Sequence, residues 1–369
     1  MMLDLARAVD DYGTSAVLAT GGALIGMAFG FFAFRSRFCL RAAVIEFWHG
    51  KFGEKLSVWL LAFSTAVVAV QALVLLGTLD ISGARQLANR GSLSGALIGG
   101  LLFGAGMIMT RGCASRLLVL SAGGNLRALL SGLVFAVTAQ ASLGGVLAPL
   151  RLNLSNLWTV EGGTSRSLLT VMGAGHWDGL VLGLLWLAVA VFFAHRAGYR
   201  PWMWIGAIGT GLAVAMAWWT TYGISRAGFD VVQVQGLTFS GPSAEWLMRV
   251  LSSPAPAIGF DFGMLPGVFA GSFLAAWRGG ELKIEGFNNG RSMARYITGA
   301  IAMGFGAMLA GGCAVGAGMT GGAIFSLTAW LALLGMWAGG GLMEKLIGEP
   351  VQTTQPSTQL APVVVQVAP

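Results

Sequence analysis

The sequence has little charge for its length. Only 10% of its 369 residues are charged, 56% are apolar, and the mean hydropathy is +0.75. A soluble globular domain carries about a quarter charged residues, so this composition excludes that class and predicts an integral membrane protein. No run of basic residues is interleaved with aromatic ones, which argues against nucleic acid as a partner.

The sequence also lacks the common motifs of metal, redox and nucleotide sites. Its three cysteines, Cys39, Cys113 and Cys313, form no C-x-x-C pair and no even disulfide framework. The three histidines stand apart from one another and from the cysteines, so we expect no metal site and no cofactor. No G-x4-G-K-[ST] motif occurs, which excludes a Walker-type ATPase within this chain.

Apolar runs, in contrast, fill most of the chain. Each is close to the roughly 20 residues that a helix needs to cross a bilayer. We therefore expect an all-α integral membrane protein with about nine transmembrane helices in one transporter domain, 1–348. The segment 349–369 has no helical period and is expected to be a disordered tail. The runs are 16–34, 56–77, 92–110, 126–148, 179–194, 201–219, 259–277, 295–311 and 324–343.

The charged residues predict an orientation. Basic residues concentrate in the connections 35–55, 195–200 and 278–295, which fall on one side of the membrane if nine spans are counted. The positive-inside rule makes that side cytoplasmic, with the N-terminus outside and the C-terminus inside. The outer connections 149–178 and 220–258 are long, and they either fold over an entrance or merely join spans.

An internal repeat surrounds the cysteines. When Cys113 is placed on Cys313, five neighbouring residues coincide: Gly99, Gly104, Gly106, Gly112 and Ala114 match Gly299, Gly304, Gly306, Gly312 and Ala314. A weaker copy ends in Arg37 and Cys39, as the first ends in Arg111 and Cys113. A fourth copy aligns Arg278 with Arg37 and has Gly280 in place of the cysteine. The repeats cover about 22–124 and 263–341, a pattern found in transporters with a central site.

The glycines of the repeat allow two structures. Close packing of helices explains Gly26 and Gly30 well, and likewise the fourth-copy glycines. The glycine-cysteine stretches at Gly112 and Gly312 instead favour short broken or re-entrant helices, whose positive N-termini face an anion. Because nine spans make the Cys113 segment run inward and the Cys313 segment outward, the two are expected to be inverted and to meet near the midplane.

The arginines and thiols suggest the chemistry of the substrate. Between Asp80 and Glu161 there are six arginines and no acid, so this stretch should attract anions. Arg111 is expected to lie deepest, where an ionisable residue usually has a function. For Arg37 and Arg278, snorkelling to the interface is the simpler explanation. A thiol is a weak donor and a polarizable acceptor, which suits a soft sulphur anion.

These glycine-cysteine segments resemble the YeeE/YedE family of membrane sulphur-transport proteins, whose best-understood members take up thiosulfate. The resemblance runs from about Gly22 to Gly341. It implies nine spanning helices with additional short ones, and cysteines that line a pathway narrowed at its middle. It also implies a small soluble sulphur-carrier protein as a cytoplasmic partner.

The sequence thus favours a permease of the bacterial inner membrane, not an enzyme, that takes up a small sulphur anion, most simply thiosulfate. Alternatives are a membrane thiol sulphur-transferase that forms a persulfide on Cys113 or Cys313, a permease for a selenium or other sulphur compound, and a structural membrane subunit. Cys39 should matter least of the three thiols, since its repeat match is weakest. The expected pathway residues are Cys39, Cys113, Cys313, Arg111, Gly112, Gly312, Arg37 and Arg278.

Overall fold

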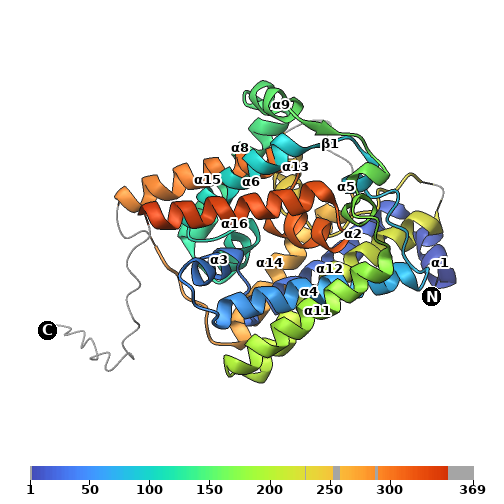
Figure 1. The fold of residues 1–369 in the computed structure, drawn as a ribbon, viewed down its shortest axis with the longest axis horizontal. Coiled ribbons are helices and arrows are strands. Elements are labelled where there is room, and N and C mark those ends of the chain that lie inside the picture. The colour runs from blue at the N-terminus through green and yellow to red at the C-terminus, as the bar shows by residue number, and fades with distance from the viewer. Residues whose placement is uncertain (1, 229, 252–257, 287–289, 348–369) are drawn as a thin grey trace, which may run out of the picture.

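The structure, a computed structural model, describes residues 2–228, 230–251, 258–286 and 290–347. These residues are nearly all helical, which confirms the all-α class (Figure 1). The expected disordered tail, 349–369, lies outside the described residues.

By length and composition, eight segments of the described chain can cross a membrane. The ninth expected run, 324–343, forms a helix of 21 residues, α16 (Leu327–Ile347), that is not among the eight. Its glycines, two tryptophans and the Glu344–Lys345 pair dilute its hydropathy. The eight segments are α2 (Thr14–Arg35) with α3 (Leu40–Trp48), α4 (Glu54–Leu75), α6 (Leu93–Met109) with α7 (Ala114–Ala122), α8 (Leu126–Gly144), α11 (His176–Arg196), α12 (Pro201–Ala227), α14 (Phe260–Arg278), and α15 (Gly290–Ala310) with η2 (Ala314–Gly321).

The long helices pack in two groups (Figure 1). In one group α6 packs on α15 and α16, and α8 packs on α15; in the other α2 packs on α12 and α14, and α4 on α11 and α12. Several short helices touch both groups, among them α7 and η2. Helix α7 contacts α8 on one side and α2 and α14 on the other, while η2 contacts α16, α4 and α12. The elements that follow Cys113 and Cys313 therefore lie where the groups meet.

Glycine permits the close approach of α2 to α14. A Cβ on Gly26 would overlap the backbone carbonyl of Met264, and one on Gly267 would overlap that of Ala23. The backbones of α2 and α14 are therefore in direct contact at these glycines, without side chains between them. Such close contact maximises van der Waals attraction in an apolar environment. The packing role expected for these glycines is confirmed.

Helices α6 and α15 run antiparallel. Gly99, early in α6, faces Ala310 at the end of α15. Gly106, late in α6, faces Gly299 in the first half of α15. The two best copies of the repeat therefore have opposite directions, as the expected inverted relation requires.

The connection expected outside the membrane, 149–178, has a structure of its own. It contains α9 (Ala148–Asn156), η1 (Thr164–Arg166), α10 (Leu168–Val171) and β2 (Thr159–Val160), which pairs antiparallel with β1 (Gly91–Ser92) beyond α5 (Arg85–Ala88). Arg166 is buried and donates to the Asn89 carbonyl and the Thr328 hydroxyl, both at 2.6 Å. Burial lowers the pKa of its guanidinium to about 10. This arginine ties the connection to the start of α16.

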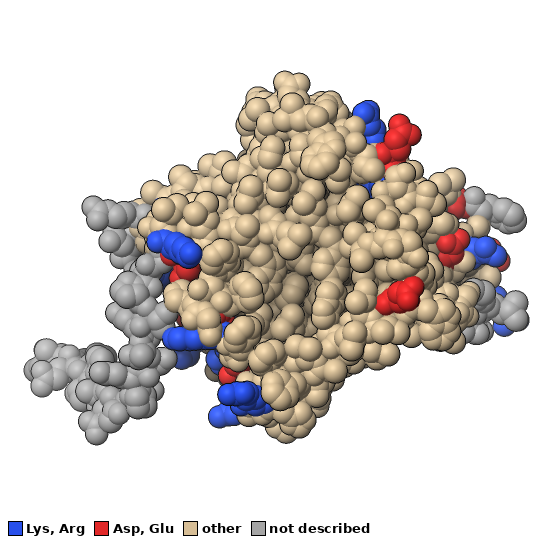
Figure 2. Space-filling view, viewed as in Figure 1, with Lys and Arg blue, Asp and Glu red and all other residues tan. Residues whose placement is uncertain are grey.

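The charged side chains lie towards two opposite ends of the molecule. On the face in Figure 2 they leave a broad band between them without Lys, Arg, Asp or Glu. Helix α1 (Met2–Tyr12) lies at one end and α3 towards the other (Figure 1). An uncharged band with charged ends is what a bilayer requires of a protein that spans it.

Candidate functional site

Three long helices stop in the same way before a cysteine. Helices α2, α6 and α15 are each followed by a residue in the left-handed region: Arg37 (φ 54°), Arg111 (φ 59°) and Gly311 (φ 79°). Two residues later stands the cysteine, in extended conformation, and a short helix begins right after it. A left-handed residue ends a helix because it turns the chain out of the helical path. The breaks expected at the cysteine segments are confirmed.

The fourth copy differs from its expected alignment. Helix α14 continues to Arg278, and the left-handed residue is Gly280 (φ 64°). Gly280 therefore corresponds in conformation to Arg37 and not to Cys39. Arg278 is an exposed residue in the last turn of the helix, so its alignment with Arg37 was wrong.

The thiols of Cys39 and Cys113 lie close enough to influence each other's charge, although no hydrogen bond joins them among the described contacts. Cys113 is fully buried and Cys39 half-buried. The Cys113 sulphur also lies 3.5 Å from the Ser115 hydroxyl. Two cysteines that are 74 positions apart in the sequence thus meet because each ends the break of a different repeat.

Arg116, one turn into α7, faces this thiol pair. Its guanidinium interacts electrostatically with both Cys39 and Cys113. Its Nη1 is buried and has no hydrogen-bond partner among the described residues. Arg111, which the sequence placed deepest, is instead exposed at the end of α6. Sequence reasoning counted Arg116 among six arginines but did not single it out, although its spacing of three from Cys113 puts it one helical turn away.

Cys313 lies at the start of η2, whose eight residues are all buried. Its sulphur, 1% exposed, accepts a weak hydrogen bond from the Gly316 N–H at 3.5 Å. Gly312 leaves room for this turn, since a Cβ there would lie 2.7 Å from the Ala317 nitrogen. Helix η2 also packs against α7, so the short helices after Cys113 and Cys313 meet.

The segment between α12 and α13 (Ser240–Leu251) reaches the same interior. Leu237, Thr238 and Phe239 are buried, although the sequence places them in a connection expected outside the membrane. The Thr320 hydroxyl donates to the Leu237 carbonyl at 2.6 Å, and Thr238 lies against Gly316. The sequence suggested at most that this connection folds over an entrance. Its tip instead forms part of the wall around η2.

Arg116 also lines a basic cavity, which includes neither cysteine in its wall. Its volume is about 280 Å³, and its charged residues are Arg37, Arg116, Lys283, Glu281 and Glu285. Glu285 already accepts a hydrogen bond from the Asn125 amide. Of the arginines that the sequence singled out, only Arg37 lines this cavity.

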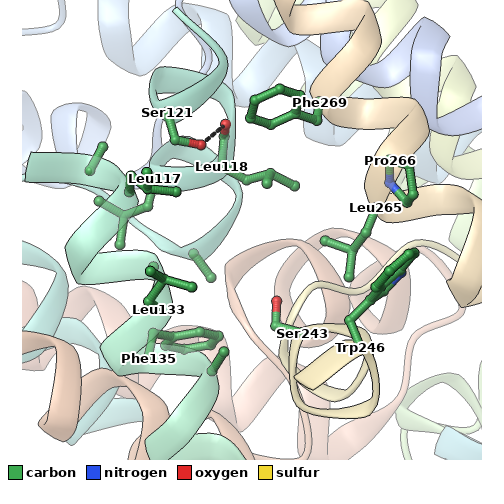
Figure 3. A pocket seen from close by; sticks show the side chains of 15 residues that line it. Leu117, Leu118, Ser121, Leu133, Phe135, Ser243, Trp246, Leu265, Pro266 and Phe269 are labelled. Atoms are coloured by element: carbon green, nitrogen blue, oxygen red, sulfur yellow. Dashed lines mark hydrogen bonds between the residues drawn. The ribbon is translucent and has the colours of Figure 1, made fainter. Parts of the chain in front are cut away.

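Two other cavities are poorly suited to an anion. The groove in Figure 3, between α7, α8, α13 and α14, is lined by apolar side chains such as Leu117, Leu133 and Phe269. The Ser121 hydroxyl at the edge of this groove donates its hydrogen bond to the Leu118 carbonyl at 2.7 Å. A smaller cavity of about 90 Å³ near the start of α14 contains two carboxylates, Glu245 and Asp261.

The donor set of the described residues excludes some chemistry. These residues hold no group of three or more His, Cys, Asp or Glu that could bind a metal, and all three cysteines are free thiols. Around the cysteines the described residues provide weak donors and soft acceptors, together with the guanidinium of Arg116. Such groups can bind an anion without holding it permanently.

Known proteins are similar to this chain over most of its length. The chain is 25% identical over 346 residues to the thiosulfate transporter TsuA of Escherichia coli (strain K12), covering 87% of this chain and 94% of that protein. It is 26% identical over 342 residues to the thiosulfate transporter TsuA of Spirochaeta thermophila, covering 86% and 96%. Both relatives are named as transporters and not as enzymes. The model of the sulphur transport family matches residues 35–342, and the chain therefore belongs to that family.

Proposed function

We propose that this protein is an inner-membrane permease that takes up thiosulfate or a closely similar sulphur anion. The substrate passes from Cys313 to Cys113 and Cys39. One observation carries the proposal: two thiols from separate helix breaks lie close to each other and to Arg116, which lines a basic cavity, and the helix after the third thiol packs on the helix after Cys113. The names of the relatives support thiosulfate as the substrate.

The chemistry of thiols fits this substrate. Thiosulfate carries a soft terminal sulphur and three hard oxygens on one central sulphur atom. A thiol donates a weak S–H hydrogen bond, and its polarizable sulphur suits the soft end of the anion. Weak contacts let the anion move on, because a pathway must bind well enough for entry and poorly enough for release. No lasting covalent bond is required.

The proposed orientation places the basic cavity at the cytoplasmic end. Arg35, Arg37 and Lys283 come from connections that the positive-inside rule assigns to the cytoplasm. Arg35 lies over the Trp202 ring at the start of α12, so these connections meet at one end of the molecule. A small sulphur-carrier protein that receives the substrate there is a partner suggested by the family resemblance alone.

Uptake of thiosulfate labelled separately on each sulphur tests the proposal. Both labels should accumulate inside proteoliposomes at equal rates. Cys113→Ser and Cys313→Ser should each abolish uptake, because serine keeps the size and polarity of the side chain but loses the soft sulphur. Accumulation of the terminal label alone would point to sulphur transfer through a persulfide. Normal uptake in both variants, at matched abundance, would end the thiol-pathway proposal.

A further inference from the structure

The basic cavity contains a guanidinium, that of Arg116, which forms no ion pair within 4.0 Å among the described residues. Arg116, on α7, lines the cavity and interacts electrostatically with both thiols. Its side chain is half-buried, and its Nη1 is shielded from solvent without a hydrogen-bond partner among the described residues. A buried charge without a partner is costly, so such groups are normally paired or bind a ligand. Because this nitrogen also belongs to a cavity with two further basic side chains, it is placed to bind an anion.

The acids of the cavity do not fill this role. Glu285 is hydrogen-bonded to Asn125. Glu281 attracts Arg116 but forms no ion pair with it within 4.0 Å in the described structure. Both glutamates lie on the segment 281–286, which is held to the loop after α7 by backbone hydrogen bonds. The Lys283 N–H donates to the Gly123 carbonyl at 3.2 Å, and the Leu126 N–H donates to the Glu285 carbonyl at 3.0 Å. The carboxylates are thus fixed at the rim.

The surroundings of Arg116 match the two ends of one kind of anion. On one side lie two thiols, which suit a soft sulphur atom. On the other side lies the cavity of about 280 Å³ with Arg37 and Lys283. A single water needs only about 10–15 Å³ of such space, so an anion of five atoms fits with part of its hydration shell. A guanidinium is the side chain best shaped to bind two oxygens of one oxyanion.

We propose that Arg116 and the basic cavity form a binding site for the oxyanion end of the substrate, while its terminal sulphur lies on the Cys39–Cys113 pair. The ligand class is a small dianion with one soft sulphur and a group of hard oxygens. This inference rests on the proposed function and adds an orientation to it: the anion arrives at the cavity with its oxygens toward the cytoplasm. Arg116 then distinguishes such an anion from hydrosulfide, which has no oxygens.

Competition between anions tests the site. Sulfate has the oxygens without the terminal sulphur, and hydrosulfide has the sulphur without the oxygens. In wild-type proteoliposomes both should inhibit uptake of labelled thiosulfate. Arg116→Gln should raise the KM for thiosulfate at least tenfold and abolish inhibition by sulfate, while inhibition by hydrosulfide persists. Arg116→Lys should lie in between, since an ammonium keeps the charge but loses the two-pronged geometry.

Arg196→Gln is the matched control. It removes the same charge from an exposed residue at the end of α11, which does not line the cavity. It should leave the KM and both inhibition constants unchanged. The inference is overturned if Arg116→Gln keeps the wild-type KM and the wild-type inhibition by sulfate. It is also overturned if Arg196→Gln raises the KM and loses sulfate inhibition to the extent expected of Arg116→Gln.

Two further measurements distinguish failure of the proposed function from failure of the proposed binding site. If the wild-type protein accumulates no thiosulfate, the proposed function is rejected. The site is then judged by sulfate binding to the purified protein, which Arg116→Gln should weaken at least tenfold. If Arg116→Gln does not fold, as judged by its elution and thermal unfolding, Arg116→Lys decides the question: a partial loss of sulfate competition supports the site, and wild-type sulfate competition overturns it.

Discussion

Gly312→Ala and Gly112→Ala add the same methyl group at matching positions of the two best repeats, but we expect opposite results. At Gly312 the new Cβ would lie 2.7 Å from the Ala317 nitrogen, and that nitrogen donates to the Cys313 carbonyl at 2.8 Å. At Gly112 the nearest atom is the end of the Leu117 side chain, 3.3 Å away. Backbone must move in the first case, whereas in the second a flexible side chain can move aside.

The magnitudes follow from this difference. Inserting a methyl group into a well-packed interior costs about 1–3 kcal/mol. Relief of that strain must displace the first turn of η2, and with it the Gly316 N–H that holds the Cys313 sulphur. If the cost falls on the transport-competent conformation, 1–3 kcal/mol corresponds to a loss in uptake of about 5-fold to 150-fold. Gly112→Ala should be neutral, or stabilising by up to about 1 kcal/mol through lower entropy of the unfolded chain.

Initial rates of labelled thiosulfate uptake, at matched membrane abundance, check this prediction. Thermal unfolding of both purified variants gives an independent measure. Equal uptake by the two variants would show that the turn at Cys313 does not control transport. A larger loss for Gly112→Ala would mean that the break before Cys113 is the tighter one, contrary to the structure.

Three other predictions concern separate parts of the molecule. A tag at the N-terminus should be reached by an impermeant reagent from outside the cell and a tag at residue 355 only from inside, and labelling of both from one side would refute the orientation. Cys39→Ala should slow uptake about tenfold, or about 1.4 kcal/mol, because this half-buried thiol lies at the cavity end of the pathway; a rate as low as that of Cys113→Ser would show that all three thiols act in series. Arg166→Ala should lower thermal stability, since it removes charged hydrogen bonds to Asn89 and Thr328, each worth about 1.5–3 kcal/mol. A changed KM in that variant would assign Arg166 to the pathway and not to the scaffold.

The sequence predicted the parts of the fold that depend on local patterns. Apolar runs marked the helices, and the glycines of α2 and α14 marked a close contact. The breaks at Cys113 and Cys313 were also predictable, because the repeat placed the same glycine-cysteine pair after two long runs. These features need no knowledge of which segments meet.

Other features depend on contacts between distant segments and were not predictable. Leu237 and Thr238 are buried because they pack on η2, about 80 residues later in the chain. The alignment of Arg278 with Arg37 failed because α14 continues further beyond its glycines than α2 does. Arg116 emerged as a site residue only when the structure brought Cys39 to Cys113. The sequence around Arg116 does not distinguish it from any other basic residue on a short helix.

The order of these groups along the interior explains how a dianion could cross without being trapped. A fixed positive charge at the centre of the pathway would bind a dianion tightly and hinder its release. Around Cys313 the structure instead provides neutral groups: a thiol, the Gly316 N–H and the Thr238 hydroxyl. The guanidinium of Arg116 comes only near the Cys39–Cys113 pair, and it lines the basic cavity. There the carboxylate of Glu281 attracts the same guanidinium, so it would compete with the oxyanion and favour its departure. The proposed pathway would therefore bind its substrate most strongly at the last step, where Glu281 would compete for the same guanidinium.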